Sequence, residues 1–194
     1  MIRIVKIIYP MQVLRPYILP IKGLKPGTHE YTYQVNDEFF AAFPDSPVKK
    51  AALELSILVD KKFGEFTVRF DFEGTMATEC DRCLAGIDLP VSGTEVLLFQ
   101  INPDGEEESD DPLLVYLAPD AHELELATYA YEFMLLAMPM IRTFDCRTGQ
   151  PPYPCDEEML DKLDAEEEAL ANRNRQEDTD KPSPWDVLKN LNKD

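Results

Sequence analysis

The sequence predicts an α+β protein: an antiparallel β-meander sheet with a buried helix across one face, a peripheral acidic helix and a tethered C-terminal segment. Two kinds of periodicity support this prediction. Apolar and polar side chains alternate between Val48 and Ile101, which is the period of half-buried strands. Apolar residues recur at helical spacing in residues 120–137 and again in residues 156–172, where the opposite side is acidic. We therefore expect a sheet of about five to seven strands.

The N-terminal part predicts strands joined by short turns. The prolines in residues 12–24 favour an extended edge strand. Residues 25–28 have the composition of a turn, and the alternation from His29 to Val35 predicts a half-buried strand. Asn36 can then cap a short helix. Short connections make the strands between residues 48 and 101 antiparallel neighbours.

The C-terminal part predicts one more strand and two helices. Residues 104–112 are an acidic, solvated loop, and a short strand follows at residues 113–117. A reciprocal cap between Asp120 and Glu123 predicts the start of the buried helix, which Pro139 ends.

The domain organisation follows from the same patterns. Residues 1–172 form a single α+β domain, in which residues 1–14 are either an extended start or a misassigned one. Residues 173–182 form a polar linker, and residues 183–194 form an amphipathic peptide that docks on its own domain or on a partner. One face of this peptide carries Trp185, Leu188 and Leu191.

The charge is unevenly distributed and limits the class of partner. The net charge of the 194 residues is −18, with ten Lys and Arg against seven Asp and Glu in residues 1–70, and nine against thirty in residues 71–194. Such an acidic chain is a poor candidate for a free-standing nucleic-acid binder and suits a basic protein partner better. No apolar run approaches the ~20 residues of a membrane span. With four cysteines and no cleavable signal peptide, we expect a cytoplasmic protein that does not bind membranes.

The strongest chemical motif is a CxxC turn between two predicted strands. Cys80 and Cys83 have the spacing of two neighbouring zinc ligands, and Cys146 and Cys155 can complete a tetrahedral site. His29 and His122 are outside candidates for this set. Inert buried thiols and redox chemistry are the alternatives. Redox chemistry is the weaker one, because this CxxC does not open a helix that would lower a thiol pKa.

No enzyme motif accompanies the cysteines. The chain lacks a glycine-rich phosphate loop, a Gly-x-Ser-x-Gly elbow and a His-Glu-x-x-His helix. We therefore expect neither catalysis nor a small-molecule substrate.

The segment Cys80-Asp81-Arg82-Cys83-Leu84, preceded by residues 19–27 and Phe39-Phe40 and followed by a helix that ends at Pro139, resembles the YceD family of large ribosomal RNA subunit accumulation proteins. The resemblance covers roughly residues 15–192. Members usually end in an Asp-Pro-Arg-Trp sequence followed by leucines, whereas residues 183–185 keep the Pro and the Trp without the Asp and the Arg. The resemblance implies a role in making the large ribosomal subunit.

The charge distribution then constrains how that role is carried out. An acidic helix can receive a basic ribosomal or assembly protein, with Trp185, Leu188 and Leu191 as apolar anchors; its first acidic residues are Glu157, Glu158 and Asp161. Contact with ribosomal RNA, direct or indirect, would use early basic residues, for which the alternative is a solvated surface; the candidates are Lys22, Lys25, Lys49 and Lys50. The alternative functions are a nuclease cofactor that binds RNA directly and a small zinc or redox module unrelated to ribosomes.

Overall fold

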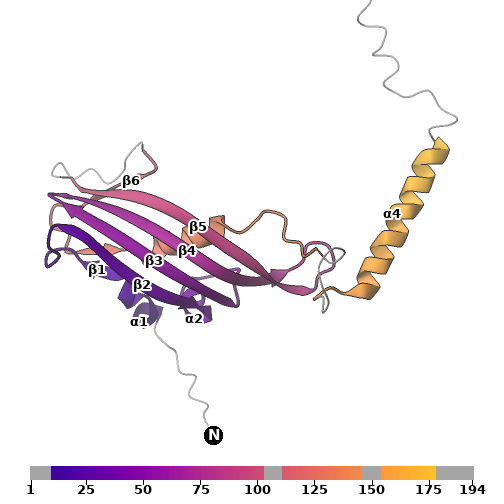
Figure 1. Cartoon of the computed structure of the whole chain (residues 1–194), viewed down its shortest axis with the longest axis horizontal. Coiled ribbons are helices and arrows are strands. Elements are labelled where there is room, and N and C mark those ends of the chain that lie inside the picture. The colour runs from indigo at the N-terminus through magenta and orange to yellow at the C-terminus, as the bar shows by residue number, and fades with distance from the viewer. Residues whose placement is uncertain (1–9, 103–110, 146–153, 178–194) are drawn as a thin grey trace, which may run out of the picture.

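The computed structural model describes residues 10–102, 111–145 and 154–177, which form a mixed α+β architecture (Figure 1). A five-stranded sheet has the order β2-β3-β4-β5-β6, and β1 pairs with β7 in a second, two-stranded sheet. This confirms the predicted fold class. The strands are β1 (Ile18–Pro20), β2 (Gly27–Asn36), β3 (Ala51–Lys62), β4 (Glu65–Glu79), β5 (Gly86–Ile101), β6 (Leu114–Leu117) and β7 (Glu123–Glu125). The helices are α1 (Pro10–Leu14), the 3-10 turn η1 (Arg15–Tyr17), α2 (Asp37–Ala41), α3 (Ala127–Leu136) and α4 (Glu157–Glu177).

Strands β2 to β5 form the predicted antiparallel meander. In β3, alternate residues from Leu53 to Val59 are buried, and in β4 the same holds from Phe66 to Phe72. The pairing register places Leu55 opposite Phe72, so the apolar sets of the two strands share one face of the sheet. A slip of one residue would turn every one of these side chains to the other face, so the alternation fixes the register.

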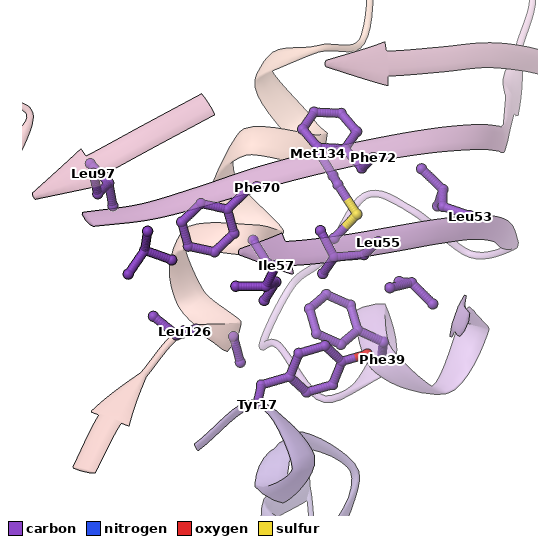
Figure 2. Packing of buried hydrophobic residues seen from close by; sticks show 14 of the residues in the cluster. Tyr17, Phe39, Leu53, Leu55, Ile57, Phe70, Phe72, Leu97, Leu126 and Met134 are labelled. Carbon is purple, nitrogen blue, oxygen red and sulfur yellow. The ribbon is translucent and has the colours of Figure 1, made fainter. Parts of the chain in front are cut away.

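The main core lies between this face of the sheet and the helices that cover it. Figure 2 shows Phe70 and Ile57 of the sheet facing the layer that contains Leu126 and Met134. The ring centroids of Phe70 and Phe133 lie 5.3 Å apart in an edge-to-face arrangement. The burial of α3 across the sheet is confirmed by its fully buried residues, which are Ala127, Ala130 and Met134.

The short helix α2 begins where the sequence predicts. The side chain of Asn36 accepts a hydrogen bond from the backbone N–H of Glu38 at 3.1 Å and so caps the helix. Phe39 and Phe40, which this cap positions, are buried in the main core.

The prediction of one extended segment over residues 12–24 was wrong. Residues 10–17 form α1 and η1, and only Ile18–Pro20 is a strand. Pro16 lies in the first turn of η1, where a proline with its fixed φ is compatible with helical geometry. The turn brings the ring of Tyr17 into the core, stacked on Tyr33 with centroids 4.4 Å apart.

The predicted start of the buried helix at Asp120 was also wrong. Residues 123–125 form β7, which pairs with β1, and the helix begins at Ala127. The carboxylate of Glu125 accepts hydrogen bonds from the backbone N–H groups of Ala127 at 2.8 Å and Thr128 at 3.2 Å. Leu124 of β7 and Leu126, the N-cap residue of α3, are both buried, and their spacing also fits two opposite apolar stripes of one buried helix.

Strand β6 lies at the predicted position but in an unpredicted direction. It pairs in parallel with β5, with Leu98 opposite Leu114. A parallel pair needs a connection of about a dozen residues or more, and the segment between Ile101 and Leu114 is that long.

The predicted acidic helix is confirmed as α4, although it runs on to Glu177, into the segment predicted as a polar linker. Figure 1 shows it leading away from the sheet. In the part of the chain that the structure describes, no helix combines the length and the apolar character needed to cross a bilayer.

Candidate functional site

The CxxC motif forms the turn between β4 and β5 that the sequence predicts. The backbone N–H of Cys80 donates to the carbonyl oxygen of Ala85 at 2.8 Å, and that of Leu84 donates to the carbonyl oxygen of Cys80 at 2.9 Å. Leu84 takes a φ of 60°, a left-handed conformation that is uncommon for a leucine. Its side chain is 63% exposed, whereas Cys80 and Cys83 are buried. The tight turn therefore turns both cysteines inward.

The surroundings of the Cys80 thiol lower its pKa. Burial raises its pKa, but backbone N–H groups of Cys83, Phe144 and Arg82 lower it, and the net effect places the pKa below its usual range. Thiolates are the form in which cysteine binds metals. The lowered pKa of Cys80 is compatible with a metal ligand, and zinc binding stays a prediction.

Arg142, which follows α3 in the chain, is linked to the CxxC turn by hydrogen bonds and an ion pair. Its backbone N–H donates to Asp81 Oδ2 at 2.7 Å, its guanidinium contacts Asp81 Oδ1 at 2.9 Å, and the N–H of Asp81 donates to the carbonyl oxygen of Arg142 at 2.7 Å. The hydrogen bonds from Arg142 hold the pKa of the Asp81 carboxyl below its usual range. The guanidinium also donates to the Thr78 hydroxyl at 3.2 Å. Sequence reasoning missed this role, because nothing near Arg142 signals a partner at position 81.

The start of α4 packs on the same turn. Cys80 and Cys83 form a small apolar cluster, the knuckle cluster, which also contains Ile87, Leu89, Ala85, Phe144, Cys155, Met159 and Leu160. Arg82 of the turn also contacts Asp164 of α4 at 3.6 Å. The turn is therefore the point at which the sheet holds the first turns of the acidic helix.

The four cysteines predicted as zinc ligands are only partly placed. Cys80 and Cys83 are free thiols, whereas Cys155 packs against them but is disulfide-bonded. Cys146 lies outside the described residues. Within the described ranges, no group of three or more His, Cys, Asp or Glu side chains is arranged to hold a metal ion. Two buried thiols, one of them with a lowered pKa, nevertheless fit a zinc-binding pair.

The two histidines lie away from the turn. His29 contacts the carbonyl oxygen of Lys25 at 2.8 Å, and His122 Nε2 lies 3.3 Å from Lys22 Nζ. His29 pairs with Val59 near the far end of the sheet, and His122 lies beside Lys22, so the structure does not bring either histidine to the cysteines.

The lysines proposed for RNA contact fall into two groups. Lys22 and Lys25 lie near the C-terminal end of β3, where Lys61 donates to the carbonyl oxygens of Ile21 and Leu24. Lys49 and Lys50 precede its N-terminal end. With ~3.3 Å per residue, the 12 residues of β3 separate the two groups by roughly 40 Å. They therefore do not form one phosphate track.

The acidic residues proposed for partner binding are exposed on α4. Glu157, Glu158 and Asp161 lie in its first turns, and Lys162 contacts Glu158 at 3.1 Å within the helix. Trp185, Leu188 and Leu191 lie outside the described residues.

A protein-family model matches more than half of the chain. The model described as "Large ribosomal RNA subunit accumulation protein YceD" matches residues 68–192, which include the CxxC turn, α3 and α4. The description names an accumulation role and no catalysed reaction. No curated protein and no solved structure matches the chain.

Proposed function

This chain belongs to the YceD family of large ribosomal RNA subunit accumulation proteins, and we propose that it is a non-enzymatic cytoplasmic factor that supports this accumulation by binding a basic ribosomal or assembly protein. The observation that carries the proposal is the exposed acidic surface of α4. Its exposed carboxylates are Glu157, Glu158, Asp161, Glu166, Glu167 and Glu168.

The position of α4 suits the capture of a partner. A helix of 21 residues is ~32 Å long, and its partly buried contacts with the knuckle cluster lie in its first turns. Residues 165–173 are exposed. Charge complementarity would speed the encounter with a basic protein more than it would raise the final affinity.

The C-terminal peptide offers the partner a second, apolar contact. In this proposal Trp185, Leu188 and Leu191 add apolar anchors to the acidic surface.

Zinc has a structural role in this proposal. With Cys155 reduced, Cys80, Cys83, Cys146 and Cys155 would hold one zinc ion, which would cross-link the β4–β5 turn to the segment that precedes α4. The ion would fix the direction in which α4 leaves the sheet. The two alternative functions, a nuclease cofactor and a zinc or redox module unrelated to ribosomes, are favoured by no specific observation in the described residues.

The test is capture of partners from a lysate of the chain's own cells, with and without ribonuclease. We expect basic large-subunit proteins to be recovered, to survive ribonuclease and to weaken as salt is raised, since exposed charges are screened. The triple substitution Glu157→Gln, Glu158→Gln and Asp161→Asn should reduce recovery severalfold.

A matched control removes three carboxylates elsewhere: Glu30→Gln, Glu54→Gln and Glu73→Gln, on strands β2 to β4. Trp185→Ala should also reduce capture while leaving the unfolding transition unchanged. Equal recovery by both triple variants would contradict the proposed role of α4, and loss of folding in Trp185→Ala would place the tail in the core.

A further inference from the structure

The turn between β3 and β4 displays an aromatic ring to solvent. Gly64 takes a φ of 71° to close this turn, and Phe63 beside it is 106% exposed. A phenylalanine with no packing contribution adds nothing to folding stability by burial. Its ring is available as a stacking surface.

A cavity of about 340 Å³ opens next to this ring. This volume is within the range of small-ligand pockets, ~300–1,000 Å³. Its apolar lining comes from four parts of the chain that the fold brings together, and its polar lining is three lysines. The lining residues are Ile21, Lys22, Pro26, Lys61, Lys62, Phe63, Gly64, Phe66, Ile101, Pro119 and Ala121.

The lysines give the cavity a positive rim. Lys22 and Lys62 are exposed, and no ion pair in the described part of the chain involves either of them. Lys61 is partly buried, with its ammonium 2.6 Å from the carbonyl oxygen of Ile21 and 5.5 Å from the centroid of the Phe66 ring. The positive charge of Lys61 is therefore stabilised by a carbonyl dipole and the Phe66 ring, and no ion pair in the described part of the chain neutralises it.

Distance separates this rim from the acidic helix. The turn lies at one end of β4, and the knuckle cluster with the start of α4 lies at the other, as Figure 1 shows. With ~3.3 Å per residue, the 15 residues of β4 span roughly 50 Å. The Debye length is ~8 Å at physiological salt, so the negative charges of α4 do not cancel the positive potential of the lysines at the rim.

We propose that this end of the sheet is a contact site for single-stranded RNA, in which Phe63 stacks on a base and Lys22 and Lys62 bind the flanking phosphates. Exposed aromatic rings beside basic side chains are the combination that recognises unpaired nucleotides. The choice of RNA rests on the proposed function, since the family description names the large ribosomal RNA. The protein would then hold RNA at one end and a basic protein at the other.

Acidic residues that are close in the sequence to the rim residues limit the expected affinity. Glu65 pairs with Lys62 across the β3–β4 turn. The sequence also holds six acidic residues between positions 104 and 111, in the connection that follows β5. We therefore expect weak binding that is detectable at low salt and falls steeply as salt is raised.

The experiment measures fluorescence anisotropy of a labelled single-stranded RNA of about 12 nucleotides, a length typical of single-strand binding sites. With the full chain, Phe63→Ala should weaken binding about tenfold, Phe63→Tyr should retain it, and Phe63→Leu should resemble the alanine variant. Lys22→Gln with Lys62→Gln should reduce the slope of log K against log salt by about 1.4, or ~0.7 for each lost phosphate contact.

The matched control is Lys49→Gln with Lys50→Gln, which removes the same charge at the other end of β3 and should leave the slope unchanged. Equal losses in both double variants, no effect of Phe63→Ala, or equally tight binding of the same RNA as a duplex would each overturn the proposal. The α4 variant should still bind RNA, and Phe63→Ala should still capture the basic protein. The two measurements therefore test the RNA site and the protein-binding site independently of each other.

Discussion

The main core and the knuckle cluster are held together by different physics. The main core is a continuous apolar layer in which four strands of the sheet meet α2, α3 and the small β1-β7 sheet. In the described part of the chain, the buried apolar residues of the knuckle cluster are only Cys80, Cys83, Ile87 and Leu89, and the cluster joins segments that lie more than fifty positions apart. It therefore depends on polar links such as Asp81–Arg142 and, in our proposal, on zinc. Alternation along strands is enough to build the first region, whereas the second needs cross-links.

The largest effect expected on global stability comes from the main core. Phe70 is fully buried, so Phe70→Ala should lower the free energy of unfolding by about 3–5 kcal/mol, from lost transfer energy and the cavity left behind. Phe63→Ala makes the same chemical change at an exposed site and should stay within about 0.5 kcal/mol. Urea denaturation of both variants checks this, and a similar cost for the two would contradict the placement of the core.

Metal removal should affect the knuckle cluster and leave the main core intact. Reduced protein should bind about one zinc ion per chain, and the ion should be lost in Cys80→Ser and Cys83→Ser variants. Chelation should then increase hydrogen exchange in residues 80–89 and 155–160, while β3 and β4 keep their protection. Elemental analysis and hydrogen exchange measure the two effects. Reduced protein without zinc, or loss of protection in β3, would contradict this prediction.

The smallest effect expected is the alkaline titration of one core residue. Burial, with a smaller contribution from Tyr33, raises the pKa of Tyr17 from 10.0 to about 12. The folded state holds this proton more tightly than the unfolded state. The resulting stability is present below pH 10.0 and is lost as the pH rises through about 12.

Tyr17→Phe removes this contribution, so its free energy of unfolding should fall less between about pH 9.5 and pH 11.5 than that of the unchanged chain, by about 2 kcal/mol. Urea denaturation at the two pH values measures the difference. The same pH dependence in both proteins would show that Tyr17 ionises as freely as in the unfolded chain.

Local pattern was sufficient to predict β2 to β5 and the Asn36 cap. Each of these depends on neighbours in sequence: alternation in the strands, and a side chain that accepts from a residue two positions on. Local pattern failed to predict the structure where a short segment fits both a helix and a strand. Leu124 fits an apolar stripe of a helix or a buried position of a strand, and only the partner strand β1 decides for β7. The direction of β6 depends on β5 in the same way.

In the candidate site too, the features that depend on local sequence could be predicted, and those that depend on distant partners could not. The spacing of Cys80 and Cys83 is enough to indicate a paired turn, and the composition of α4 is enough to indicate an acidic surface. Neither Arg142 nor Phe63 carries a signal of its own. Arg142 matters because of Asp81, and Phe63 because Lys22 and the cavity lie beside it.

The sequence by itself determined the central meander, the CxxC turn, the amphipathic and acidic helices and the charge asymmetry, because periodicity, turn chemistry and charge are local properties of a chain. The tertiary structure alone decided that Lys22 and Lys62 lie together while Lys50 lies far from both, and that α4 starts at the knuckle cluster. These facts depend on which strands pair and in which direction. Pairing is a competition between distant segments, and it is settled by the burial of the whole apolar face.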